Sequence, residues 1–193
     1  CESGGDPKNI PDLTYENFLN FHRTYYHPSN SYIYLYGNMD MEEKLAFLDE
    51  HYLSHFDYLD VDSVIQEQKE FGACRDVTLE YPVAENEGEE DNTYLSYNMV
   101  VGNAADSQMA MAFEVLDYAL LSAPGAPLKQ ALLDVKAGKD VYGSYDDGIL
   151  QPYFTVIAKG SNPDRKEEFV SVIRQVLGDI VKNGIDKKAV EAG

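Results

Sequence analysis

The chain has 193 residues, of which 44% are hydrophobic and 25% are charged. These fractions are typical of a globular protein and argue against disorder along the whole chain. The net charge of -19 repels nucleic-acid phosphates, and no apolar stretch reaches the roughly 18 residues of a membrane-spanning helix, so we expect neither nucleic acid nor a membrane as a partner.

The first predicted element is a helix that follows Thr14, its expected N-cap, and ends near Tyr26, two residues before the helix-breaking Pro28. Four residues of this segment recur at helical spacing, which predicts one packed face. They are Phe18, Phe21, His22 and Tyr25.

A strand and a second helix are expected next. Residues 32–36 are strong β-formers with apolar or aromatic side chains on both faces, which predicts a strand that enters a sheet. Asp40, followed three residues later by Glu43, predicts a capping box for a helix that runs to about His55. The expected buried stripe of that helix consists of Met41, Leu45, Leu48 and Tyr52.

Residues 57–74 lose this periodicity and are interpreted as a linker. Residues 76–81 then alternate apolar and polar side chains, which predicts a half-exposed strand. The acidic run 85–92 is expected to be a solvated hairpin loop, because so many like charges cannot pack together. Residues 94–101 form the expected return strand.

The remaining pattern predicts helices around two further strands. Asp106 is the expected cap of one helix, and Pro127 is the expected first residue of the next. Two antiparallel strands and a long helix follow, and a further helix begins after Asp186. These elements cover 141–145, 153–158, 163–183 and 187–192. The sequence thus predicts an α+β fold, with an antiparallel or mixed sheet and helices packed on one face.

One pair of histidines has the spacing of metal ligands. His51 and His55 stand four residues apart and would share one face of a helix. Zinc needs at least a third ligand, and neither zinc-peptidase motif, His-Glu-x-x-His or His-x-x-Glu-His, occurs in the chain. We therefore prefer to interpret the pair as histidines near a helix C-terminus, where positive charge is favoured.

Other catalytic constellations and targeting signals are missing from the sequence. It contains no Gly-x-Ser-x-Gly elbow, and Cys74 has no histidine near it in sequence. Two cysteines, Cys1 and Cys74, do not form a disulfide framework, and the N-terminal residues lack the features of a signal peptide. We expect a protein that is not secreted, and the missing initiator methionine suggests a piece of a longer chain.

Several runs resemble the presequence-protease-like subgroup of the pitrilysin/insulinase (M16) family of zinc metallopeptidases. The runs are Ser3–Pro7, Ile10–Glu16, Phe21-His22, Tyr25–Ser31, Tyr36-Gly37, Ala126–Leu132 and Tyr142–Tyr145. The resemblance implies large clamshell peptidases built from four similar α+β domains, which degrade short unstructured peptides inside a closed chamber. Zinc in this family is bound by the first domain.

The resemblance also implies a domain assignment. Residues 1–56 correspond to the helix-strand-helix end of a preceding repeat, 57–74 to a linker, and 75–193 to the second, non-catalytic domain, truncated at its C-terminus. No catalytic or metal-binding residue carries over to this sequence. Zinc would belong to the upstream domain of the parent protein, and the fragment alone is expected to be inactive.

The resemblance also suggests candidate residues for the chamber, and two alternative functions stay open. Tyr142, Tyr145, Asp146 and Asp147 are candidates to line the substrate chamber. In one interpretation the chain is the chamber-forming partner domain of a zinc peptidase; in the other it is a stand-alone structural or peptide-binding module. Expected partners are other domains of the same parent chain and short peptides, and the fragment is expected to be able to self-associate. The expected compartment is the bacterial cytoplasm or an organelle matrix.

Overall fold

A computed structural model describes residues 4–86 and 88–192. Cys1, Ser3 and Glu87, which enter the sequence interpretation above, lie outside the described residues. The chain divides into two compact units, Cys1–Gln66 and Glu67–Gly193. Each unit has its own secondary structure.

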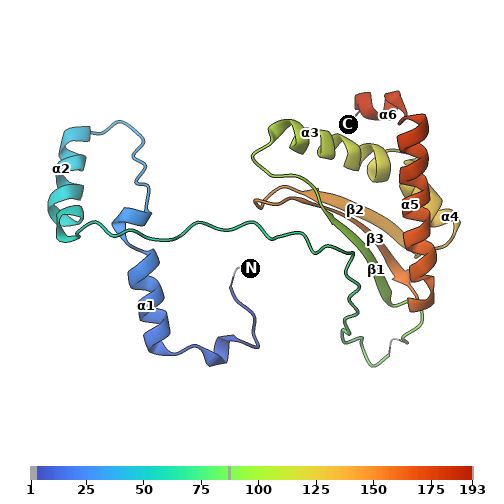
Figure 1. The fold of residues 1–193 in the computed structure, drawn as a ribbon, viewed down its shortest axis with the longest axis horizontal. Helices are drawn as coiled ribbons and strands as arrows, with labels where there is room; N and C mark the ends of the chain where they lie inside the picture. The colour runs from blue at the N-terminus through green and yellow to red at the C-terminus, as the bar shows by residue number, and fades with distance from the viewer. Residues whose placement is uncertain (1–3, 87, 193) are drawn as a thin grey trace. The chain divides into compact units, whose positions relative to one another are not determined.

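The described residues of the first unit form two helices with short 3₁₀ turns around them (Figure 1). The helices are α1 (Tyr15–Tyr25) and α2 (Met41–His51), and the turns are η1 (Ile10–Asp12), η2 (Pro28–Asn30) and η3 (Leu53–His55). The predicted caps are both present, because Thr14 accepts a hydrogen bond from the amide of Asn17 at 3.1 Å, and Asp40 accepts one from the amide of Glu43 at 3.1 Å.

Three expectations for this unit are wrong. Residues 32–36 have no strand assignment, and α2 ends at His51 because Tyr52 leaves helical geometry, with φ of -140°. The stripe expected to be buried is not, since no described residue before Gln66 is buried. The same physical reason explains why the expected strand and the expected buried stripe are both missing. Strand pairing and helix burial both need a second surface, and the described part of this unit has no sheet and no core.

The described residues of the second unit form an antiparallel sheet of three strands. They are β1 (Thr93–Val100), β2 (Asp140–Asp146) and β3 (Tyr153–Ser161), in the order β1-β3-β2. The register places Asn98 beside Thr155, and Thr155 beside Ser144, in one row across the sheet. The predicted α+β class with an antiparallel sheet is confirmed.

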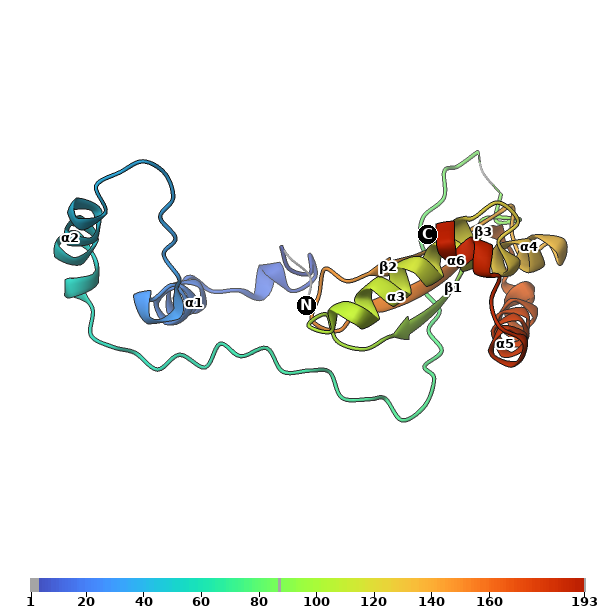
Figure 2. The same ribbon diagram turned by 90° about the horizontal axis from the view of Figure 1, so that it is seen from above.

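Helices cover one face of this sheet, and α3 lies over the strands in both views (Figures 1 and 2). In chain order they are α3 (Ser107–Asp117), the π-helical turn η4 (Tyr118–Ser122), α4 (Pro127–Asp134), η5 (Pro163–Arg165), α5 (Lys166–Asn183) and α6 (Lys187–Ala192). Asp106 caps α3 by accepting hydrogen bonds from the amides of Gln108 and Met109 at 3.1 and 3.0 Å, as predicted.

The core lies between the sheet and its helices. Leu128 and Leu132 of α4, and Phe169 and Ile173 of α5, are at most 1% exposed. They pack against every second residue of the strands, which sets the inner face of the sheet. The inward strand residues are Leu95, Val141, Phe154, Val156 and Ala158.

The strand expected at residues 76–81 is not formed. This segment has no strand assignment, although its return partner β1 is present, so the expected hairpin is missing its first arm. Val77 and Leu79 are 70% and 83% exposed. The alternation of side chains indicates which residues suit a strand. A strand also needs backbone hydrogen bonds to a neighbouring strand, and the outer edge of β1, an edge strand of the described sheet, has not formed them with this segment.

Candidate functional site

The uncovered face of the sheet is the candidate site of the second unit. Because successive side chains of a strand point to opposite faces, residues that alternate with the core positions share this second face. Most are polar or aromatic. They are Tyr94, Ser96, Asn98 and Val100 on β1; Tyr153, Thr155, Ile157 and Lys159 on β3; and Asp140, Tyr142, Ser144 and Asp146 on β2.

The centre of this face is a cluster of neutral polar side chains. The hydroxyl of Thr155 donates to Oδ1 of Asn98 at 2.6 Å, and Nδ2 of Asn98 donates to Oγ of Ser96 at 2.9 Å. Thr155 is only 7% exposed, so the neighbouring strands hold its side chain in a fixed position. Hydroxyl and amide groups both donate and accept, and such groups can bind the backbone of an extended peptide.

An acidic rim lies beside this cluster at the end of β2. The phenol of Tyr153 donates to Oδ2 of Asp146 at 2.9 Å, and Oδ1 of the same carboxylate accepts from the amide of Gly148 at 3.0 Å. The hydrogen bond to Asp146, and then its negative charge, raise the pKa of Tyr153. Tyr153 is therefore a neutral phenol at physiological pH, and it is unsuited to act as a base.

The four candidate chamber residues fall in different places. Tyr142 and Asp146 lie on the uncovered face, and Tyr142 is 39% exposed in the register position next to Ile157. Asp147 lies just beyond β2, in the connection to β3. Tyr145 lies on the helix-covered face, where its ring stacks on Phe113 with the centroids 5.4 Å apart.

The environment of Tyr145 differs accordingly from that of the other three. Burial raises the pKa of its phenol first, and the negative charges of Asp147, Glu114 and Asp106 raise it further. Its packing on Phe113 at the edge of the core gives it a structural position rather than one on the candidate peptide surface. The structure thus brings Tyr142 and Asp146 to one face and leaves Tyr145 off it.

Sequence reasoning missed the polar centre of this face. Asn98, Thr155 and Tyr153 were not among the candidate residues. The signal that could have identified Asn98 and Thr155 is the period of two in their strands, where each alternates with apolar residues of the core. The pairing of Asn98 with Thr155 depends on the register of strands 57 residues apart, which the pattern alone does not fix.

The described residues do not bring His51 and His55 together as metal ligands. His51 is the last residue of α2, whereas His55 lies in η3 beyond the break at Tyr52, so the two do not share one helix face. The ring of His51 packs against Phe47, with the centroids 4.5 Å apart. Within residues 4–86 and 88–192, no group of three or more His, Cys, Asp or Glu side chains could hold a metal ion.

No helix in the described part of the chain is both long and apolar enough to cross a membrane. The hydroxyl, amide and carboxylate groups of the uncovered sheet face can form hydrogen bonds with a peptide.

Comparison with protein families gives one match that covers most of the chain. The family model described as "Peptidase M16 inactive domain" matches residues 12–193. The match includes both units, so the region before residue 67 and the sheet domain after it correspond to one family model.

Individual proteins give similar matches. The chain is 48% identical over 190 residues to protein HypA of Clostridium perfringens. This match covers 98% of this chain and 20% of that protein. It is 35% identical to presequence protease 1, chloroplastic/mitochondrial, of Arabidopsis thaliana, covering 99% of this chain and 18% of that protein. It is 31% identical to the mitochondrial presequence protease of Xenopus laevis, and this match covers 98% of this chain and 19% of that protein. The chain therefore spans about a fifth of the length of these relatives.

Proposed function

The chain belongs to the M16 peptidase family, in which it matches the inactive domain, and from this premise we propose that it forms a non-catalytic wall of a peptide-degrading chamber. The parent protein would be a zinc peptidase that acts on short unstructured peptides. Zinc would be bound outside this chain, because the described residues supply no ligand set for it.

The observation that carries this proposal is the uncovered sheet face with its fixed polar centre. An extended peptide could hydrogen-bond through its backbone to the exposed side chain of Asn98, which the buried hydroxyl of Thr155 holds in place at 2.6 Å. Tyr142 offers an exposed aromatic surface for an apolar side chain, and Asp146 and Asp147 offer negative charge for a basic one. The net charge of -19 would favour basic peptides over acidic ones.

The first unit has a separate proposed role, which is to complete a neighbouring domain of the same parent chain. Its helices leave large apolar side chains in solvent, since Phe18 is 65% exposed and Phe21 is 59% exposed. Residues 31–36 have no strand partner in the described part of the chain. We therefore interpret the two helices and the unpaired segment 31–36 as parts of a domain whose sheet is formed by other residues of the parent chain.

This exposure also bears on the alternative of a stand-alone module. Such a module would need its own core in the first unit, and no described residue before Gln66 is buried. We therefore favour a domain of a larger peptidase. We also propose that the chain on its own self-associates through these apolar helices, and that its parent works in the bacterial cytoplasm or in an organelle matrix.

The experiment that tests peptide binding is a titration of the 193-residue chain with a short, basic, unstructured peptide carrying a fluorescent label. We expect weak binding that falls at least severalfold in a variant with Asn98→Ala and Asp146→Asn. The control is Val181→Ala, which changes an 85% exposed side chain on α5. Equal affinity in the variant and in the control would contradict a binding role for the uncovered face.

A further inference from the structure

The uncovered sheet face carries opposite charges at its two ends. Asp146 lies at one end, in the register position next to Tyr153, and Asp147 follows it directly. Lys159 lies at the other end, six residues after Tyr153 on the same strand. At roughly 3.3 Å per residue, the two ends are about 20 Å apart. An extended ligand of about seven residues therefore spans the face from the acidic end to the basic one.

Aromatic and apolar side chains surround the basic end. The ammonium of Lys159 lies over the ring of Tyr94, 5.8 Å from the ring centroid, and Tyr94 is 47% exposed. Tyr81 lies edge-on to Tyr94, with the two centroids also 5.8 Å apart. Tyr142 and its register neighbour Ile157 continue this surface toward the centre of the face. The basic end can therefore contact an anionic group and an apolar side chain at once.

Two carboxylates at this end are paired with other lysines. Asp140, the register neighbour of Lys159 on β2, has Oδ1 3.9 Å from Nζ of Lys129. Asp91 has Oδ2 3.2 Å from Nζ of Lys139. Lys159 itself forms no ion pair with any residue in the part of the chain that the structure describes. Its positive charge can therefore pair with a ligand.

We infer that the basic end binds the C-terminal carboxylate of a peptide that lies on this face. The ammonium of Lys159 pairs with the carboxylate, and the last side chain of the peptide packs on Tyr94 and Tyr142. A basic residue about six positions earlier then reaches Asp146 at the acidic end. The peptide runs in the same direction as β3, because the reverse direction would bring its carboxylate to Asp146. This inference rests on the proposed function and deepens it, since it names the end of the peptide that is recognised.

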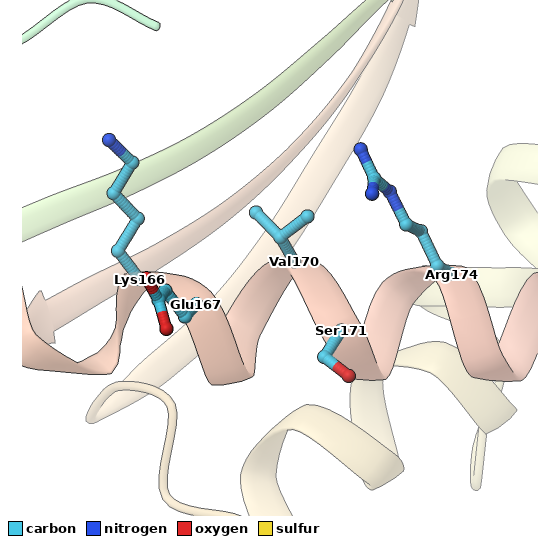
Figure 3. Close-up of a pocket in the computed structure, with 5 residues that line it drawn as sticks. All are labelled: Lys166, Glu167, Val170, Ser171 and Arg174. Carbon is cyan, nitrogen blue, oxygen red and sulfur yellow. The ribbon is translucent and has the colours of Figure 1, made fainter.

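Another pair of cations, outside this face, provides a comparison. Lys166 and Arg174 project from the same side of α5 and line a hollow of about 370 Å³ (Figure 3). All the residues that line this hollow belong to α5, which packs on the other face of the sheet. Lys166 already forms an ion pair with Asp76, which leaves Arg174 as the exposed cation of the hollow. Arg174 is therefore a matched control for Lys159, because a peptide on the uncovered face does not reach it.

A double-mutant cycle tests the contact with the carboxylate. The probe is a fluorescent peptide of about seven residues with arginine first and phenylalanine last, made with a free C-terminal carboxylate and with a C-terminal amide. The 193-residue chain should bind the carboxylate form roughly threefold more tightly, the size expected of an exposed ion pair. Lys159→Gln should weaken binding of the carboxylate form to the level of the amide form and leave binding of the amide form unchanged. Arg174→Gln should keep the preference, and an equal loss for both forms in Lys159→Gln would overturn the inference.

A peptide with the reversed order of residues tests the direction of binding. With phenylalanine first, arginine last and a free carboxylate, it cannot place its arginine at Asp146 and its carboxylate at Lys159 together. It should therefore bind roughly threefold more weakly than the original order. Equal affinity of the two orders would show that the face does not fix a direction, and the inference would be wrong.

The outcomes separate this inference from the proposed function. Equal affinity for the carboxylate and amide forms, with weaker binding after Asn98→Ala and Asp146→Asn, overturns the carboxylate subsite and leaves a peptide-binding face. Absence of binding to either form overturns both. If a second copy of the chain covers the face instead, Lys159→Gln changes the mass measured by light scattering and alters neither peptide affinity, and this result also contradicts the inference.

Discussion

Gln68 and Gln151 form two reciprocal hydrogen bonds across 83 residues of sequence. The backbone amide of Gln68 donates to Oε1 of Gln151 at 2.7 Å, and Nε2 of Gln151 donates to the carbonyl of Gln68 at 3.1 Å. Next to them, Nδ2 of Asn103 donates to Oε1 of Glu67 at 2.7 Å. The side-chain amide of Gln151 thus satisfies both the backbone amide and the backbone carbonyl of Gln68, as a neighbouring strand would. This contact fixes the start of the second unit.

The first prediction concerns this contact. Gln151→Ala should release residues 67–71, because it removes the donor and the acceptor that hold Gln68, while the partly exposed position of Gln151 keeps the cost to global stability within roughly 1 kcal/mol. Limited proteolysis should show faster cleavage in this stretch, with an unchanged thermal midpoint. Gln175→Ala, an exposed change on α5, is the control. Unchanged cleavage in the Gln151 variant would mean that the contact does not hold the linker.

The second prediction compares two glycines. A Cβ at Gly143 would overlap the carbonyl oxygen of Thr155 and Cδ1 of Leu121, whereas a Cβ at Gly178 would meet nothing within 4 Å. Gly143→Ala should therefore lower the free energy of unfolding by roughly 1–3 kcal/mol through overpacking. Gly178→Ala lies inside α5 and should raise it by roughly 0.5–1 kcal/mol through helix propensity. Urea denaturation of the two variants measures both effects, and equal midpoints would contradict the packing at β2.

The third prediction concerns a carboxylate at the end of α3. Oδ1 of Asp117 is buried without a hydrogen-bond partner among the described residues, and burial raises the pKa of this side chain above its ordinary value. A raised carboxyl pKa means that the charged form is disfavoured in the folded state. Stability is therefore lost as the pH rises from the unfolded pKa, near 3.8, through the higher folded pKa.

Asp117→Asn removes the charge and should stabilise the chain at pH 7 by roughly 1 kcal/mol. Near pH 3 the two proteins should have similar stability, because Asp117 is then protonated in both states. Asp179→Asn, at an exposed position of α5, is the control for the general effect of one charge. Urea denaturation at the two pH values makes the comparison, and a difference that does not depend on pH would rule out the buried charge as its cause.

Local signals in the sequence were sufficient for the helix starts but not for the strand partners. Thr14, Asp40 and Asp106 cap their helices as predicted, because a cap is decided by residues within one turn. Residues 32–36 and 76–81 carry the correct alternation for strands, yet neither is paired. Pairing depends on an edge supplied by distant residues, which no local pattern specifies.

The candidate site shows the same division. Tyr142 and Tyr145 were grouped as chamber residues, but they stand three residues apart in one strand, and an odd spacing places them on opposite faces. Parity alone would have separated Tyr145 from Tyr142 and Asp146. The hydrogen bond from Thr155 to Asn98 could not have been derived in this way, because it depends on the register between β3 and β1.

The last prediction separates the two units by their response to matched substitutions. Phe169 is 1% exposed in the core of the second unit, whereas Phe18 and Phe21 on α1 are 65% and 59% exposed. Phe169→Ala should cost roughly 3–5 kcal/mol of unfolding free energy, because it leaves a cavity that its neighbours cannot fill.

Phe18→Ala combined with Phe21→Ala should leave that free energy unchanged within roughly 0.5 kcal/mol, since neither ring is buried in this chain. The same double variant should reduce self-association, because it removes apolar surface from α1 that we propose contacts a second copy when the neighbouring domain is absent. Chemical denaturation measures the first effect, and light scattering coupled to size-exclusion chromatography measures the second. A large loss of stability in the double variant would show that α1 is packed against a core in this chain, and it would contradict the proposal that its partner surface belongs to another domain of the parent protein.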